Sequence, residues 1–267
     1  MVIDFHTHIF PDKIAQKTID YLAEKGGNKP WSNGTVEGLL SGMQRGGVDL
    51  SITLPVLTKP EQFESVLNYA IMINNEYKGN KVISFAGIHP KCVDIKEKLR
   101  AVKNAGIKGV KIHPDYQDTP IDDEGYIEIL TTAKELDLIV VTHAGIDCAY
   151  RDKATMCSPE KLCKVIDIIN HEKFVLAHYG SSELFDEVYT LLAGKNVYFD
   201  TAYILKMISK EQFNKILEKH GSNKVLFATD FPWSDMKGDL EIIRSFIDDK
   251  TVLEKVLYKN ALNLLGM

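Results

Sequence analysis

The segment VIDFHTH, residues 2–8, places an apolar run directly before two histidines. Its Val, Ile and Phe residues are typical of a strand that is buried on both faces. Residues two apart in a strand point to the same side, so His6 and His8 face one region. A doubly wound dinucleotide-binding sheet would instead show a Gly-rich turn after its first strand. This segment therefore favours a different parallel-sheet fold.

Seven further apolar runs follow, and stretches with helical periodicity separate them. Alternating strands and helices imply a parallel sheet. Eight such units without a Pro/Gly/Ser-rich linker predict a single (β/α)₈ TIM barrel, an α/β fold that needs about 250 residues. We expect one domain over residues 1–267. The predicted strands are Val2–His6, Val48–Leu54, Lys81–Ile88, Ile107–His113, Leu138–His143, Phe174–His178, Val197–Thr201 and Val225–Thr229.

The stretches between the strands carry helix start signals as well as apolar periodicity. Pro60 is a good first-turn residue, and Ser158 is a good N-cap. The stretch Thr251–Met267 is predicted to form a C-terminal helix that caps the barrel. The other predicted helices include Glu61–Tyr77, Asp123–Leu136, Pro159–Asn170, Ser182–Leu192, Lys206–Lys219 and Leu240–Ile247.

The composition narrows the class of partner. The chain has 45% hydrophobic and 26% charged residues and a formal net charge of −5. Nucleic-acid binding usually requires a basic face, so this charge argues against it. There is no apolar run long enough to cross a bilayer and no signal-type N-terminus. We expect a cytoplasmic protein with a small-molecule substrate and no membrane partner, and we leave a homodimer open.

Most of the histidines lie at the carboxyl ends of the predicted strands, where barrel enzymes have their active sites. Six of the eight histidines end predicted strands, whereas His171 and His220 lie near helix ends. The carboxyl ends of barrel strands meet on one face, where active sites form. The six are His6, His8, His89, His113, His143 and His178. The eighth predicted strand adds Asp230, and imidazole and carboxylate groups together suit zinc and similar divalent ions.

The order of these residues resembles the pattern of the amidohydrolase superfamily. That pattern has His-x-His after the first strand, His after the fifth and sixth strands, and Asp after the eighth. The amino-acid sequences of several segments resemble those of the amidohydrolase 2 branch. This branch also contains aminocarboxymuconate semialdehyde decarboxylase and related aromatic-acid decarboxylases. These segments are Asp4–His8, Lys111–Pro114, Thr142–Gly145, His178–Gly180 and Thr229–Trp233.

The resemblance implies a role for each matching residue. His6, His8, His143 and Asp230 would bind one divalent metal, which we expect to be zinc, while Asp230 and His178 would be catalytic. Binuclear members of the superfamily have a carboxylated Lys or a Glu on the fourth strand. If a second ion binds here, we expect His178 and Lys111 to hold it.

The expected reaction is metal-dependent hydrolysis of a C–N, ester or lactone bond in a small carboxylate- or carbonyl-containing molecule. A metal-bound water would supply hydroxide at neutral pH. Expected substrate contacts are His113, Arg151, Tyr179 and Trp233. Arg151 would form a bidentate pair with a substrate carboxylate, and Tyr179 and Trp233 would form an aromatic wall.

The sequence leaves three alternatives open. A metal-dependent decarboxylase of an aromatic or unsaturated acid would use the same ligands. A TatD-type nuclease would share the histidines and the final Asp, but such proteins have Glu where this chain has Lys111 and His113. A non-catalytic metal-binding or scaffold protein is the third alternative, and the complete ligand set argues against it.

Overall fold

The strands of the protein are short and parallel, and they lie where the apolar runs predicted them. The computed structural model describes residues 1–77 and 81–267. The predicted strand Lys81–Ile88 forms two pieces, β3 and β4, on either side of Phe85. The strands are β1 Ile3–Thr7, β2 Leu50–Thr53, β3 Val82–Ser84, β4 Ala86–Gly87, β5 Gly109–Ile112, β6 Ile139–Thr142, β7 Phe174–Leu176, β8 Tyr198–Asp200 and β9 Val225–Leu226.

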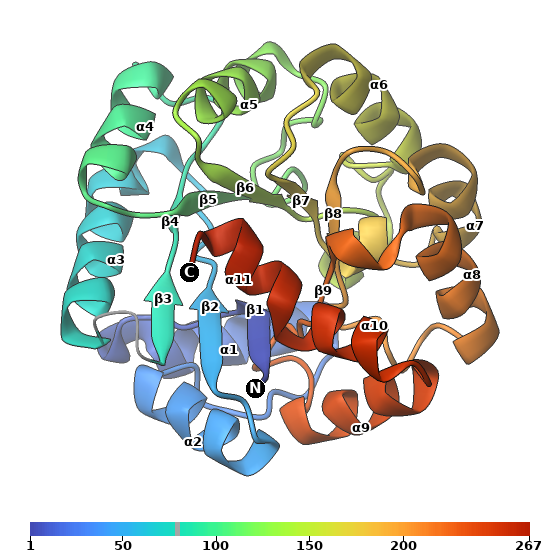
Figure 1. Cartoon of the computed structure of the whole chain (residues 1–267). Helices are drawn as coiled ribbons and strands as arrows, with labels where there is room; N and C mark the ends of the chain where they lie inside the picture. Colours follow the sequence, from blue (N-terminus) through green and yellow to red (C-terminus); the bar gives the residue numbers. More distant parts are fainter. Residues whose placement is uncertain (78–80) are drawn as a thin grey trace.

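The strands form a (β/α)₈ barrel, as the sequence predicted. Regular pairing gives two sheets, with the strand orders β1-β2-β3 and β4-β5-β6-β7-β8-β9. The two sheets meet at two seams, which join them into one ring. At one seam, β3 and β4 are consecutive pieces of one strand, and the Phe85 amide between them donates to the Thr53 carbonyl of β2 at 3.0 Å. At the other, the Phe5 amide donates to the Phe227 carbonyl at 2.9 Å. The last strand thus returns to the first, and Figure 1 shows the resulting ring.

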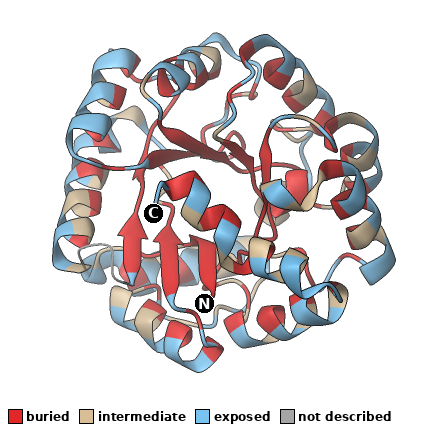
Figure 2. Ribbon diagram, viewed as in Figure 1, coloured by how far each residue is buried: buried red, intermediate tan, exposed pale blue. Residues whose placement is uncertain are grey.

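Helices surround the strands, and Figure 2 shows their buried residues on the side that faces the barrel. Two predictions differ in detail. The helix expected over Lys206–Lys219 begins at Lys210, because Ser209 caps it by accepting a hydrogen bond from the Gln212 amide. The stretch Ser182–Leu192 forms only the short α7 and the π-helical turn η4. The helices are α1 Asp12–Gly26, α2 Val36–Gly46, η1 Pro60–Gln62, α3 Phe63–Tyr77, α4 Ile95–Asn104, α5 Glu124–Glu135, η2 Cys148–Tyr150, α6 Pro159–Ile169, η3 His178–Gly180, α7 Phe185–Glu187, η4 Val188–Leu192, α8 Lys210–His220, η5 Ser222–Lys224, α9 Met236–Phe246, α10 Lys250–Glu254, η6 Lys255–Lys259 and α11 Asn260–Leu265.

The C-terminal helix α11 closes the amino end of the barrel. A capping helix was predicted, but the stretch Thr251–Met267 is divided into α10, η6 and α11. Leu264 and Leu265 from α11 belong to the same buried cluster as Ile3 and Leu50, which begin β1 and β2. Figure 1 shows α11 lying across the centre of the ring. Apolar side chains thus fill the amino end of the barrel, and the polar residues that follow the strands lie at its carboxyl end. Within the described residues, no helix has both the length and the apolar character that a membrane span requires.

We expect Leu264→Ala to lower the free energy of unfolding, although Leu264 lies at the end of the barrel opposite to the histidines. Leu264 is buried, and removing a buried Leu side chain typically costs about 2–5 kcal/mol. Urea unfolding of both proteins measures this loss. Met267→Ala is the matched control, because Met267 is exposed. A Leu264→Ala variant as stable as the control would show that α11 does not support the barrel.

Candidate active site

His6, His8 and Asp230 converge at the carboxyl end of the barrel. The Nε2 atoms of His6 and His8 lie 3.3 Å and 3.0 Å from Oδ1 of Asp230. One ligand atom from each residue lies within 4.8 Å of the other two. His6 is almost completely buried, whereas His8 and Asp230 are 15% and 13% exposed. The open side of this first ligand group is therefore the side of His8 and Asp230.

The barrel seam brings the three residues together. The Asp230 amide donates to the His6 carbonyl at 2.9 Å, although the residues are 224 positions apart in the chain. The buried Asp4 carboxylate supports this seam by accepting hydrogen bonds from the Thr229 amide at 3.0 Å and the Thr229 hydroxyl at 2.5 Å. Alternation along β1 then directs His6 and His8 to the same side.

Hydrogen bonds fix the tautomers of both histidines. Nδ1 of His6 lies 2.9 Å from the Asp200 carboxylate, and Nδ1 of His8 lies 3.0 Å from the Leu54 carbonyl. Both partners are acceptors, so each Nδ1 carries a proton. Each Nε2 is therefore the ring nitrogen left to bind a cation, and it faces the carboxylate of Asp230.

Burial and neighbouring groups shift the pKa values of His6 and Asp230. Burial, and then Lys111, hold the pKa of His6 well below its usual value, so its ring is neutral. Burial alone would raise the pKa of Asp230, but His6 and His8 outweigh that effect and lower it. Two imidazole lone pairs and an ionised carboxylate are a donor set that suits a divalent cation. The residues present therefore fit the expected metal.

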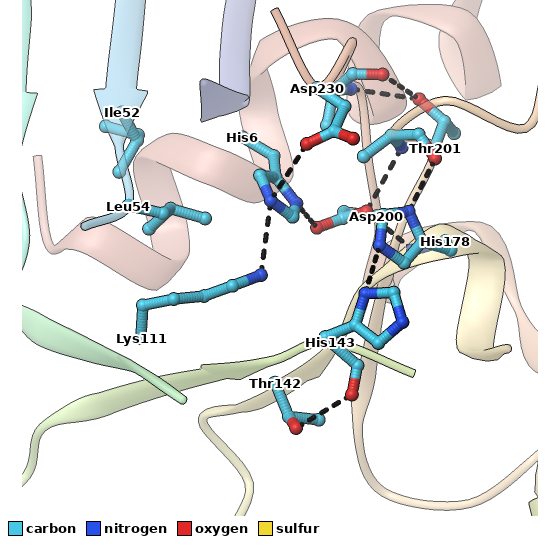
Figure 3. Close-up of polar contacts among 12 residues, drawn as sticks. His6, Ile52, Leu54, Lys111, Thr142, His143, His178, Asp200, Thr201 and Asp230 are labelled. Atoms are coloured by element: carbon cyan, nitrogen blue, oxygen red, sulfur yellow. Dashed lines mark hydrogen bonds and ion pairs between the residues drawn. The ribbon is translucent and has the colours of Figure 1, made fainter. Parts of the chain in front are cut away.

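Lys111 on β5 also points into the barrel. Its side chain is fully buried, and its Nζ lies 3.2 Å from Nε2 of His6. Burial lowers the pKa of Lys111 to about 8, and the nearby Asp200 and Asp230 oppose that effect. Figure 3 shows His6 joined to Lys111, Asp200 and Asp230.

Sequence reasoning missed Asp200, which ends β8. Its Oδ2 faces His6, and its Oδ1 accepts hydrogen bonds from the amides of His178 at 3.0 Å and Ala202 at 3.1 Å. Burial raises the pKa of this carboxyl, and His178 and Lys111 counteract the rise. An aspartate within the apolar run Val197–Thr201 was the signal that could have found it.

His143 lies in a second ligand group with His113 and Asp147. The rings of His113 and His143 are stacked, with centroids 4.1 Å apart. Nδ1 of His143 lies 2.9 Å from Nε2 of His178, while its Nε2 lies 4.0 Å from Asp147. His143 is thus not among the three residues of the first ligand group, and its role as a fourth ligand of the same metal stays a prediction. His178 connects the two groups, because its ring centroid lies 5.6 Å from that of His6.

The expected substrate contacts have different surroundings. Tyr179 does not line the site, and this prediction needs correction. Its backbone has a φ of 58°, which turns the ring into the core, where it stacks on Phe213 and donates to the Phe213 carbonyl. Arg151 is exposed, and one of its guanidinium nitrogens donates to Glu183 at 2.9 Å. Trp233 is half-buried, and its amide donates to the Asp230 carbonyl.

We expect Asp200→Asn to weaken divalent-metal binding by about 10–100-fold, the usual effect of losing a carboxylate behind a histidine ligand. The amide no longer supplies a charged acceptor that fixes the His6 ring. Isothermal titration of metal-free protein with Zn²⁺ measures the change.

The control is Asp248→Asn, because Asp248 is exposed and contacts only Lys210 among the hydrogen bonds of the described residues. Equal Zn²⁺ affinities for the Asp200 and Asp248 variants would contradict the positioning role of Asp200.

Comparison with solved structures supports the fold over the whole chain. A 5-carboxyvanillate decarboxylase from Sphingomonas paucimobilis has 15% identity and a TM-score of 0.72, and the match covers 100% of this chain and 99% of that chain. A probable 2-pyrone-4,6-dicarboxylic acid hydrolase from Acinetobacter baumannii has 17% identity and a TM-score of 0.70, with the same coverages. A dihydroxybenzoic acid decarboxylase from Polaromonas sp. JS666, with bound manganese and the inhibitor 2-nitroresorcinol, has 13% identity and a TM-score of 0.71, covering 99% of this chain and 96% of that chain. At these identities the likeness shows the fold alone.

The family follows from the sequence itself. A search of curated proteins gives no significant match. The family model described as amidohydrolase matches residues 92–267, which is about two thirds of the chain. The matched part contains His143, His178 and Asp230, while His6 and His8 precede it. The chain therefore belongs to the amidohydrolase family, as the order of its histidines predicted.

Proposed function

We propose that the protein is a metal-dependent hydrolase that cleaves a C–N, ester or lactone bond in a small carboxylate- or carbonyl-containing molecule. The observation that carries this proposal is the convergence of two imidazole lone pairs and the Asp230 carboxylate at the carboxyl end of the barrel. We assign a divalent ion to His6, His8 and Asp230, and three such ligands leave a position open for water. The nitrogen and oxygen donors favour zinc. When bound, such an ion lowers the pKa of its water from 15.7 to about 7.

We assign proton transfer and stabilisation of the substrate oxygen to two residues of this site. The Asp230 carboxylate, at the open side, accepts the proton of the attacking water and returns it to the leaving group. His178 borders the first ligand group, and we assign it to the substrate oxygen that gains charge in the transition state. Its ring is held in place because Nδ1 donates to the Ala202 carbonyl at 3.0 Å. His113 and Trp233 remain our candidates for substrate contacts.

A decarboxylase is the second candidate function, because the comparisons include decarboxylases on this fold. Two of the three solved structures described above are named as decarboxylases, and one of them holds manganese. Such an enzyme would use the same three ligands, but a substrate carbon would receive the proton instead of a leaving group. Carbon dioxide release from hydroxybenzoates, measured beside hydrolysis of lactones, esters and amides, distinguishes the two candidates. Carbon dioxide release without any hydrolysis would contradict the hydrolase proposal.

We expect Asp230→Asn to lower kcat by about 10²–10⁴-fold, because the amide cannot accept the water proton. The measurement is turnover at saturating metal on the best substrate of the panel above. Circular dichroism checks that the barrel still folds.

Glu241→Gln is the matched control, since Glu241 is an exposed residue of α9. Full turnover by the Asp230 variant would remove Asp230 from the chemistry.

A further inference from the structure

A cavity of about 250 Å³ lies at the amino end of the barrel, opposite to the candidate active site. It is formed where the C-terminal ends of α4 and α11 meet the residues at the beginnings of β5 and β6, and Figure 1 shows α11 beside these strands. Four large apolar side chains and three lysines contribute to its lining. We propose that this cavity binds a small organic dianion. The inference is independent of the reaction that takes place at the other end of the barrel.

The lining of the cavity is positively charged, although the whole chain has a formal net charge of −5. Lys103, Lys108 and Lys173 line it, and Asp137 supplies the single carboxylate among the lining residues. Three ammonium groups and one carboxylate leave a net charge of +2. A local excess of positive charge attracts anions, and this excess is equal and opposite to the charge of a dianion.

Two of the three lysines are free to bind an anion. Nζ of Lys173 pairs with Oδ1 of Asp137 at 2.5 Å. Among the described residues, Lys103 and Lys108 have neither an ion pair nor a side-chain hydrogen bond within the protein. The Asp137 carboxylate is shared, because Lys173 first and then Lys103 hold its pKa below the usual value. One carboxylate therefore faces more than one ammonium group, and a bound anion would balance the remainder.

Capping of the neighbouring helix does not account for these lysines. Lysines near the C-terminal end of a helix often donate to its last carbonyls. At the end of α4, however, the amides of Gly106 and Ile107 donate to the carbonyls of Lys103 and Val102 at 3.0 Å and 3.2 Å. Lys134 shows the capping role, since its Nζ donates at 2.9 Å to the carbonyl of the last residue of α6.

The inner part of the cavity is apolar, which limits the class of ligand. Ile107, Ile139, Leu264 and Leu265 line it, and each of them is more than nine-tenths buried. A cavity of about 150 Å³ holds benzene, so one of about 250 Å³ has room for about ten non-hydrogen atoms. The ligand that fits is a dianion with an apolar part of about six carbons. A dicarboxylate and a phosphate monoester both meet this description.

The test is isothermal titration of metal-free full-length protein with adipate and with phenyl phosphate. We expect at least one of these dianions to bind at one site per chain. Inorganic phosphate, which has no apolar part, should bind about 10-fold more weakly than the better probe. The neutral 1,6-hexanediol should show no binding, because it cannot pair with the lysines. A preference for adipate identifies a dicarboxylate as the ligand, and a preference for phenyl phosphate identifies a phosphate monoester.

Variants locate the bound probe. We expect Lys103→Gln and Lys108→Gln each to weaken binding of the better probe by about 3-fold or more, because each removes one ammonium group and keeps the length of the side chain. Lys96→Gln is the matched control, since Lys96 is an exposed residue of α4 outside the cavity lining. His8→Ala should also keep the wild-type affinity, because His8 lies at the carboxyl end.

Three outcomes would overturn the inference. Neither dianion binds to the wild type, or both lysine variants bind as tightly as the Lys96 control, or inorganic phosphate binds as tightly as the better probe. A loss of binding in His8→Ala alone would place the probe at the opposite end of the barrel and would also contradict it. Thermal unfolding shows that each variant is folded. Since no step measures turnover, failure of this inference leaves the proposed function unaffected.

Discussion

The seam between β1 and the segment after β9 is the constraint on which the active face depends. Backbone hydrogen bonds from Phe5 to Phe227 and from Asp230 to His6 join the two ends of the chain into one ring. Without this seam, His6 and Asp230 would belong to separate edges of an open sheet. The barrel therefore supplies the ligand geometry by closing, and the buried carboxylate of Asp4 reinforces the closure through Thr229. The opposite end is occupied by α11, so stability and chemistry lie at different ends of the barrel.

Burial gives the polar residues of this face their chemical character. A buried histidine is held neutral and keeps a lone pair, while its other nitrogen must find an acceptor. Asp200, Leu54 and Ala202 provide those acceptors for His6, His8 and His178. The result is a set of fixed rings, in which Nε2 of His6 and of His8 faces Asp230 and Nε2 of His178 faces His143.

Much of the fold and part of the site could be predicted from the sequence, for physical reasons that differ between residues. Strands buried on both faces must be apolar, so apolar runs in the sequence predicted the barrel strands. The histidines that follow these runs predicted which end of the barrel holds the candidate site. Asp200 was missed because its partner His6 is 194 positions away. The placement of Tyr179 was wrong because its backbone adopts a left-handed conformation, which no periodicity reveals. The orientation of the His143 ring depends on His178, and such a contact exists only once the barrel has closed.

The two proposed functions would use the same ligands, so we expect the choice between them to lie in the loops above the strands. The structure shows how these loops are joined. Nδ2 of Asn28, after α1, donates to the Cys148 thiol sulfur at 3.1 Å, and the Tyr203 hydroxyl donates to Oδ1 of Asn28 at 2.9 Å. Nζ of Lys25 lies 3.8 Å from the centre of the Tyr150 ring. Segments that follow β1, β6 and β8 thus meet over the carboxyl end, and the side chains that join them are not among the assigned metal ligands. Substrate specificity can change at these contacts while the metal-binding face below stays the same.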